Sequence, residues 1–319
     1  MPGRASVKSG PRTYPLGLLA QGKRAQTVFL PLVSARVGPM HPDSKNPRHF
    51  IQSVRILSCG LATAAGDSAR RTALVAIVMA ECLSGAAAQA QKLPAGFVYL
   101  RNIDPTIIQD MRYAGSNNFV GRPLRGYEAA ECVVKREVGA LLKSIQEELV
   151  LQKLSLKMFD CYRPTRAVAD MVAWSRDGRE TVASKRFNPA FSKADLFRLG
   201  YIATHSGHST GAALDLSLVD LKADNSATFD PARDYGDCTA NVNLRAPDGS
   251  IDMGTGYDCT DVKSHTSAKS ITADQRKWRE KLVLLMRRRG FVNYSKEWWH
   301  FSLPGAGRPA YDFPIAPRK

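Results

Sequence analysis

The chain has 319 residues, of which 44% are hydrophobic and 23% are charged, an ordinary composition for one large globular domain or two small ones. Its net charge is +16, but residues 1–90 hold 11 Lys and Arg against 3 Asp and Glu, so half of the excess lies in a leader. The remaining residues contain no compact basic stripe interleaved with aromatic residues, which argues against a nucleic-acid partner.

Residues 70–90 have the order of a secretory signal. Arg70 and Arg71 precede the apolar run 72–79, and small residues lead to an A-x-A pattern at 88–90. This is the sequence of a positive n-region, an h-region and a cleavage site. We therefore expect a signal peptide at 70–90 and an exported, periplasmic product. An internal apolar helix and a twin-arginine signal are alternative interpretations of the same residues.

The place of this segment in the chain is unusual, because a signal begins within a few residues of the true start. Residues 1–69 precede it, and we expect them to be a non-native or disordered extension. The apolar run is too short to span a bilayer, and Glu81 interrupts it. We expect no stable membrane insertion after cleavage, and the true start codon stays open.

Hydrophobic periodicity after this leader predicts strands and helices in one domain, residues 91–319. Apolar residues at helical spacing, together with start and stop signals, predict helices at 129–151, 165–176 and 272–289. Alternating and β-rich segments predict strands at 97–100, 154–160 and 212–219, and a closing hairpin at 291–294 and 298–303. Two polar segments are expected to be loops, namely 177–200, with a helical turn, and the Gly- and Asp-rich insertion 220–258.

Four of the six cysteines follow the expected cleavage site, and they are Cys132, Cys161, Cys238 and Cys259. An even number of cysteines in an exported domain permits disulfides. None of them has C-x-x-C spacing, so a structural role is favoured over a zinc knuckle or a redox motif. Cys238 and Cys259 flank the insertion and are the preferred pair, with Cys132 and Cys161 as the other. The sequence leaves this pairing open.

The stretch 206–215 sets His208 and Asp215 seven positions apart around Gly211, with small residues between them. This spacing is typical of half a metal site. A zinc ion used for hydrolysis normally takes three protein ligands of the His, Asp or Glu type and leaves a fourth position for water. His300, near the C-terminus, is the candidate for the third ligand.

A zinc hydrolase also needs a carboxylate that accepts a proton from water and a cation that stabilises the oxyanion. Glu297, three residues before His300, is the candidate base. Arg163, at a strand-to-helix junction beside Pro164, is the candidate cation. The tryptophans between Glu297 and His300 favour a strand, in which a bulge or twist would be needed to bring both side chains to one metal.

Each of these patterns taken alone has a plainer explanation. A single His-x6-Asp spacing arises by chance or in a surface hydrogen bond, and an arginine beside a proline is usually at the surface. Trp298 and Trp299 alone would be core or rim residues. His205, three residues before His208, is an alternative ligand or a bystander.

Several motifs in one order resemble those of the VanX-type zinc D-alanyl-D-alanine dipeptidases. They are S-x-H-x-x-G-x-A-x-D at 206–215, E-W-W-H at 297–300, D-M-R-Y-A at 110–114, D-x-Y-R-P at 160–164 and M-G-x-x-Y-D at 253–258. The resemblance covers residues 95–305. Several independent motifs in family order are far more specific than any one of them.

This resemblance implies a single α+β domain with a central antiparallel sheet flanked by helices and a zinc site in a small pocket, the D-Ala-D-Ala peptidase/hedgehog-like fold. It implies one Zn²⁺ per chain, bound by His208, Asp215 and His300. It also implies that Glu297 is the catalytic base and that Arg163 stabilises the tetrahedral intermediate.

The same resemblance implies three substrate-binding residues. Asp258 and Tyr113 would lie near the free amino group of the substrate, and Ser206 near the substrate. The chain departs from the family pattern at Tyr257, where phenylalanine is frequent, and in the insertion with its two cysteines, which would reshape the pocket entrance.

The function that we expect is zinc-dependent hydrolysis of the small dipeptide D-Ala-D-Ala to two D-alanine molecules by metal-activated water. One alternative is a D,D-carboxypeptidase or endopeptidase acting on peptidoglycan stem peptides. Another is a non-catalytic peptidoglycan-binding module, which predicts loss of the base or the cation, whereas Glu297 and Arg163 are both present. The physiological role (D-alanine recycling, wall remodelling or glycopeptide resistance) and the oligomeric state stay open.

Overall fold

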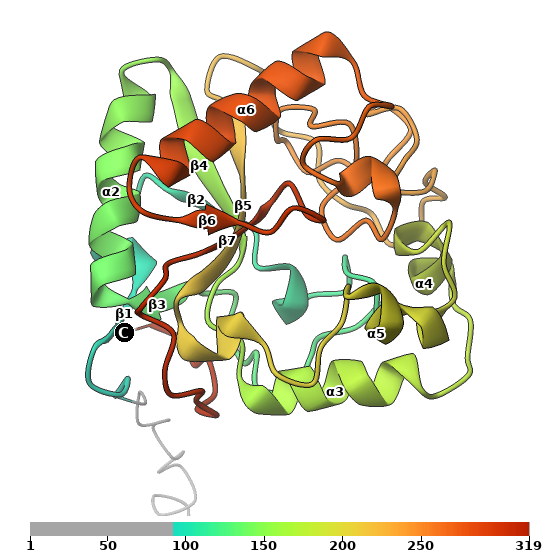
Figure 1. Ribbon diagram of the computed structural model, residues 1–319, viewed down its shortest axis with the longest axis horizontal. Helices are drawn as coiled ribbons and strands as arrows, with labels where there is room; N and C mark the ends of the chain where they lie inside the picture. The colour runs from blue at the N-terminus through green and yellow to red at the C-terminus, as the bar shows by residue number, and fades with distance from the viewer. Residues whose placement is uncertain (1–91, 319) are drawn as a thin grey trace, which may run out of the picture. The chain divides into compact units, whose positions relative to one another are not determined.

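The computed structural model describes residues 92–318 (Figure 1). The extension expected at 1–69 and the signal peptide expected at 70–90 lie outside the described residues, and both stay predictions. Within 92–318, no helix has both the length and the apolar character needed to cross a membrane.

The central sheet of the described chain has the strand order β2-β4-β5-β7-β6. Its strands are β2 (Ile108–Gln109), β4 (Leu154–Asp160), β5 (Ala213–Asp220), β6 (Val292–Asn293) and β7 (His300–Ser302). The pairs β4–β5, β5–β7 and β7–β6 are antiparallel, but β2 runs parallel to β4. The prediction of an antiparallel sheet was therefore wrong at one edge. The short strand β2, which the sequence did not indicate, makes the sheet mixed.

A smaller antiparallel sheet pairs β1 (Phe97–Tyr99) with β3 (Val133–Lys135). The first long helix, α2 (Arg136–Val150), begins directly after β3. The prediction of a helix from residue 129 was therefore wrong for its first turns. Val133 and Val134 are β-branched residues that suit a strand, and pairing with β1 uses them there.

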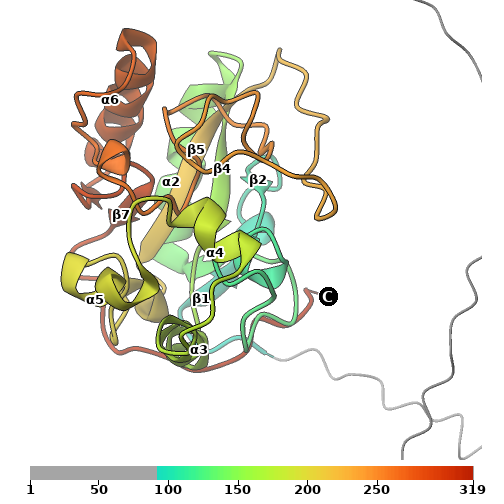
Figure 2. The same cartoon turned by 90° about the vertical axis from the view of Figure 1, so that its right-hand side faces the viewer.

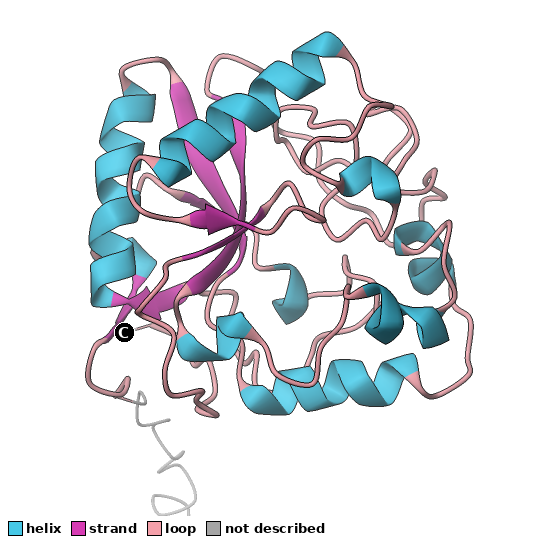
Figure 3. Cartoon of the chain, viewed as in Figure 1, coloured by secondary structure: helices cyan, strands magenta, loops and turns pink. Residues whose placement is uncertain are grey.

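The remaining helices are α3 (Thr165–Ser175), α4 (Val182–Phe187), α5 (Leu196–Leu199) and α6 (Ala273–Arg287). The predictions for α3 and α6 are confirmed. Thr272 and Gln275 form a capping box at the start of α6, which satisfies backbone donors that the first helical turn leaves free. The segment 177–200, expected to be a loop with one helical turn, holds two short α-helices and a 3₁₀ turn at Lys193–Asp195 (Figure 3).

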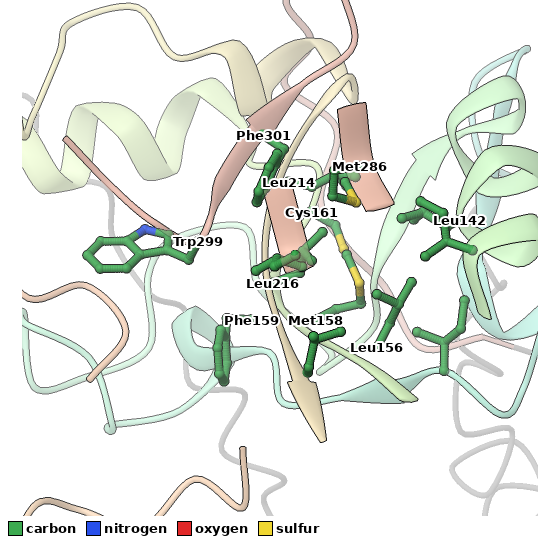
Figure 4. Close-up of a cluster of buried hydrophobic side chains, with 14 of the residues drawn as sticks. Leu142, Leu156, Met158, Phe159, Cys161, Leu214, Leu216, Met286, Trp299 and Phe301 are labelled. Carbon is green, nitrogen blue, oxygen red and sulfur yellow. The ribbon is translucent and has the colours of Figure 1, made fainter. Parts of the chain in front are cut away.

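Alternation along β4 and β5 gives the sheet one apolar face. Leu156 pairs with Leu218, and Met158 with Leu216, and all four side chains are fully buried. They join residues of α2 and α6 in one cluster, and Figure 4 shows Leu142 of α2 and Met286 of α6 around these strands. Each such side chain contributes about 1.5–3 kcal/mol on burial, so this cluster fixes the strands that carry the site.

The segment 221–261, all of which the structure describes, contains neither helix nor strand, as expected for the insertion. It extends from β5 in gold and orange in Figure 2. The disulfide Cys238–Cys259 closes a loop within it, and a second disulfide joins Cys132 to Cys161. The preferred pairing of the four cysteines is confirmed.

Candidate metal centre

Three neighbouring strands bring acidic and histidine side chains together across the sheet. Asp215 on β5 pairs with His300 on β7 and with Asp160 at the end of β4. A register shift between Met158 and Asp160 places Asp160 opposite Asp215. Directly opposed residues lie on the same face of a sheet, so these three side chains meet on one face.

His208 comes from a 3₁₀ turn, Gly207–Thr210, directly before β5. The Ser206 hydroxyl caps this turn by accepting a hydrogen bond of 3.2 Å from the His208 backbone N–H. Gly211 ends the turn with a φ of +76°, and a Cβ there would lie 2.3 Å from the Phe97 ring. The small residues of the motif therefore fold into a turn that places His208 beside β5.

The donor atoms of His208, Asp215 and His300 lie close enough to hold one metal ion. Nε2 of His208 is 3.2 Å from Nδ1 of His300 and 3.4 Å from Oδ1 of Asp215, and Nδ1 of His300 is 2.9 Å from that oxygen. Ligand distances of about 2.0–2.2 Å in a tetrahedral zinc site would separate the donors by roughly 3.3–3.5 Å. The donor set therefore fits such a group.

The far side of the His208 ring fixes which nitrogen is free. Nδ1 lies 2.8 Å from the carbonyl oxygen of Cys161, and a carbonyl oxygen can only accept a hydrogen bond. Nδ1 therefore carries the proton, and the lone pair of Nε2 faces Asp215 and His300. A backbone carbonyl behind a histidine in this way is the usual support for a metal ligand.

Glu297 lies in the turn between β6 and β7, in neither a strand nor a helix. The His300 backbone N–H donates to the Glu297 carbonyl at 3.2 Å, so the tight turn replaces the strand bulge or twist that we expected. Oε2 of Glu297 is 3.7 Å from Nδ1 of His300. Burial raises the pKa of Glu297 to about 7, with the charge of His300 opposing this shift. A general base is most effective when its pKa lies near the working pH.

Arg163 is held by buried carboxylates and is not the surface arginine of the plainer explanation. Its Nε and Nη2 donate to Oδ2 of Asp160 at 2.9 Å and 2.8 Å, and Nη2 lies 3.6 Å from Oδ2 of Asp215. Asp160 also accepts from the Tyr127 hydroxyl at 2.6 Å. Burial by itself would lower the pKa of Arg163. The charges of the neighbouring carboxylates, Asp160 first, outweigh burial and hold this pKa well above its ordinary value, so the guanidinium stays charged.

Tyr113 and Asp258 form a second polar pair beside the donor set. The Tyr113 hydroxyl donates to Oδ2 of Asp258 at 2.7 Å. Asp258 has a φ of +60°, a conformation that costs a non-glycine residue about 1–2 kcal/mol. Burial, with the charge of Asp215 second, raises the pKa of Asp258 well above its usual range.

One pocket of about 290 Å³ is lined by all eight residues to which the sequence analysis assigned a role. They are His208, Asp215, His300, Glu297, Arg163, Ser206, Asp258 and Tyr113. Ligand pockets range over about 300–1,000 Å³, so this one suits a small substrate. His205 is exposed at its edge and is not part of the three-residue donor cluster.

Two residues around the site were given no role by the sequence. Asp160 holds Arg163 and lies 3.3 Å from Nδ1 of His208. Tyr257 donates a hydrogen bond to Asp215. The role of Asp160 could have been predicted, because it stands at the end of a predicted strand and three residues before Arg163. The role of Tyr257 could not, because its contact with Asp215 joins residues 42 positions apart in the chain.

A His/Asp/His donor set beside a buried carboxylate and a paired arginine is the arrangement of a metal-dependent hydrolase. Comparison with known proteins agrees with this class. Residues 94–231 and 238–316 match the model of the M15 peptidase family, described as D-ala-D-ala dipeptidase. The chain belongs to this family.

Similar proteins share this description. A D-alanyl-D-alanine dipeptidase of Streptomyces coelicolor is 32% identical over 222 residues, which cover 69% of this chain and 98% of that protein. One from Enterococcus faecium is 30% identical over the same shares of the two chains. One from Escherichia coli is 29% identical over 210 residues, 66% of this chain and 85% of that protein.

Proposed function

We propose that the protein is a zinc dipeptidase that hydrolyses D-Ala-D-Ala to two molecules of D-alanine. The observation that carries this proposal is the donor triangle of His208, Asp215 and His300, with Glu297 beside it in a small pocket. Family membership and the dipeptidase activity for which its relatives are named agree with it. A single D-Ala-D-Ala peptidase/hedgehog-like domain over residues 91–319 is part of the same proposal.

His208, Asp215 and His300 would hold the ion, which when bound polarises the scissile carbonyl and lowers the pKa of a water molecule. Glu297 accepts a proton from the attacking water and passes it to the leaving amine. Arg163 donates hydrogen bonds to the oxygen on which negative charge develops. Its anchoring by Asp160 places that donor before the reaction begins.

Asp258 and Tyr113 would bind the free amino group of the dipeptide. They form a joined pair at the pocket wall, and an ammonium group there would compensate the buried carboxyl of Asp258. Ser206 would lie near the substrate, since it lines the same pocket. The free amino group of a dipeptide is one residue from its scissile bond, so a site for that group in the same small pocket as the donor set supports a dipeptide substrate.

Export to the periplasm is the proposed location. The signal expected at 70–90 supports it, and so do the two disulfides, because disulfides persist in oxidising compartments and are rare in the cytosol.

The direct test is release of D-alanine from D-Ala-D-Ala by the purified protein. We expect activity that a chelator abolishes and added Zn²⁺ restores, and that Glu297→Ala reduces by about 10²-fold or more. Undiminished activity in Glu297→Ala would refute the mechanism. A stem pentapeptide run in parallel distinguishes the rival function, because turnover of the stem without turnover of the dipeptide would identify a carboxypeptidase or endopeptidase.

A further inference from the structure

Tyr257 contacts the candidate ligand Asp215 on the side away from the histidines. Its hydroxyl donates a hydrogen bond of 3.0 Å to Oδ2 of Asp215. The other carboxylate oxygen, Oδ1, lies 2.9 Å from Nδ1 of His300. The two oxygens of one carboxylate therefore have different partners, and only Oδ1 belongs to the donor triangle.

Packing fixes the position of this hydroxyl. The Tyr257 side chain is 1% exposed, and its ring stacks on Phe159 with centroids 4.7 Å apart and meets the edge of Trp299 at 5.6 Å. The nearest nitrogen of Arg163 lies 3.6 Å from the same Oδ2, beyond hydrogen-bond distance. Among the described residues, Tyr257 thus supplies the hydrogen bond to this oxygen.

We propose that Tyr257 is a positioning residue for metal binding, which holds Oδ2 so that Asp215 presents Oδ1 alone to the ion. This inference rests on the proposed metal centre. A carboxylate held by one oxygen takes one coordination position, and a catalytic zinc site needs three protein ligands and an open fourth position. Removal of such outer partners typically lowers metal affinity by about 10–100-fold.

The test is the zinc dissociation constant of Tyr257→Phe, measured on the metal-free protein by competition with a chromophoric chelator. This variant removes one hydroxyl and keeps the packed ring. We expect zinc affinity about 10–100-fold weaker than that of the unchanged protein. The matched control is Tyr99→Phe, because Tyr99 is also buried and its hydroxyl donates at 3.0 Å to the Ala316 carbonyl. We expect unchanged zinc affinity in this control.

Two further readouts separate positioning from a general loss of structure. The metal-free forms of the two variants should show similar small decreases in Tm, since each loses one hydroxyl hydrogen bond. At saturating zinc, kcat of Tyr257→Phe should also fall, because the freed Oδ2 of Asp215 can take the coordination position that the water needs, whereas kcat of Tyr99→Phe should be unchanged.

Equal zinc affinity in Tyr257→Phe and the unchanged protein would overturn the inference and leave the proposed function intact. Equally weakened affinity in Tyr99→Phe would also overturn it, because the loss would then be structural. If the unchanged protein did not bind zinc, the proposed metal centre would fail, and this inference with it.

Discussion

The sheet and the loop segment 221–261 both supply residues to the site, but they hold them by different means. Asp215 and His300 are placed by strand pairing in a sheet that packs against a buried apolar cluster. Asp258 lies in a segment without helix or strand, next to the disulfide Cys238–Cys259, with a left-handed backbone. The strands therefore fix the donor set through many shared contacts, whereas the loop depends on a few strong local constraints.

The largest effect on stability is expected from a substitution on the sheet, at Asp160. Asp160→Ala leaves the Arg163 guanidinium without its main partner in a buried position. Removing one member of a buried ion pair costs about 3–5 kcal/mol, so we expect the free energy of unfolding to fall by that amount in urea titrations.

The matched control for Asp160→Ala is Asp195→Ala, because the side chains of Asp195 and its partner Arg198 are 41% and 73% exposed. We expect this exposed pair to contribute little to stability. Equal losses of stability in the two variants would show that the Asp160–Arg163 pair is no stronger than a surface ion pair.

The second largest effect on stability is expected in the loop segment 221–261, from loss of its disulfide. The double variant Cys238→Ser/Cys259→Ser removes a cross-link of 21 residues' separation, and such links contribute about 2–4 kcal/mol. We also expect a higher KM for the dipeptide with a smaller change in kcat, because Asp258 is adjacent to Cys259 and the donor set is on the strands. Steady-state kinetics give KM and kcat, and urea titrations give the free energy of unfolding. A fall in kcat with unchanged KM would contradict the assignment of substrate binding to the loop and of metal binding to the strands.

The smallest of the three effects is the steric clash expected at Gly211, which ends the turn that carries His208. Gly211→Ala adds a Cβ that would lie 2.3 Å from the Phe97 ring, in addition to backbone strain at a φ of +76°. We expect this clash to lower the free energy of unfolding by about 1–3 kcal/mol, beyond the loss from backbone strain, and to weaken zinc binding because His208 shifts.

Gly178→Ala separates backbone strain from the steric clash at Gly211. Gly178 has a φ of +67° with nothing within 4 Å of the added Cβ, so it should lose only the strain of about 1–2 kcal/mol and keep zinc affinity. Thermal unfolding measures the loss of stability, and chelator competition measures the zinc affinity. Unchanged zinc affinity in Gly211→Ala would show that the turn does not position the histidine.

Much of the architecture could be predicted because it depends on local patterns. The helical spacing of apolar residues gave α3 and α6, and alternation gave β4 and β5. The start of α2 was placed too early, because the β-branched Val133 and Val134 pair with β1, a partner more than 30 positions away. The parallel edge strand β2 was missed because a strand of two residues is too short to show an alternation of apolar and polar residues.

The amino-acid sequence by itself indicated the chemistry that we propose for the site. The residue types and order of its motifs indicated His208, Asp215 and His300 as ligands, Glu297 as base and Arg163 as cation. Side-chain chemistry is a property of each residue and needs no partner to be recognised.

Only the tertiary structure decided how these groups meet. Asp215 and His300, 85 positions apart, are neighbours because β5 pairs with β7, and a register shift places Asp160 opposite Asp215. Tyr257 reaches Asp215 from a segment without periodic structure. Contacts between distant parts of a chain depend on the packing of all the elements between them, so local sequence patterns do not specify them.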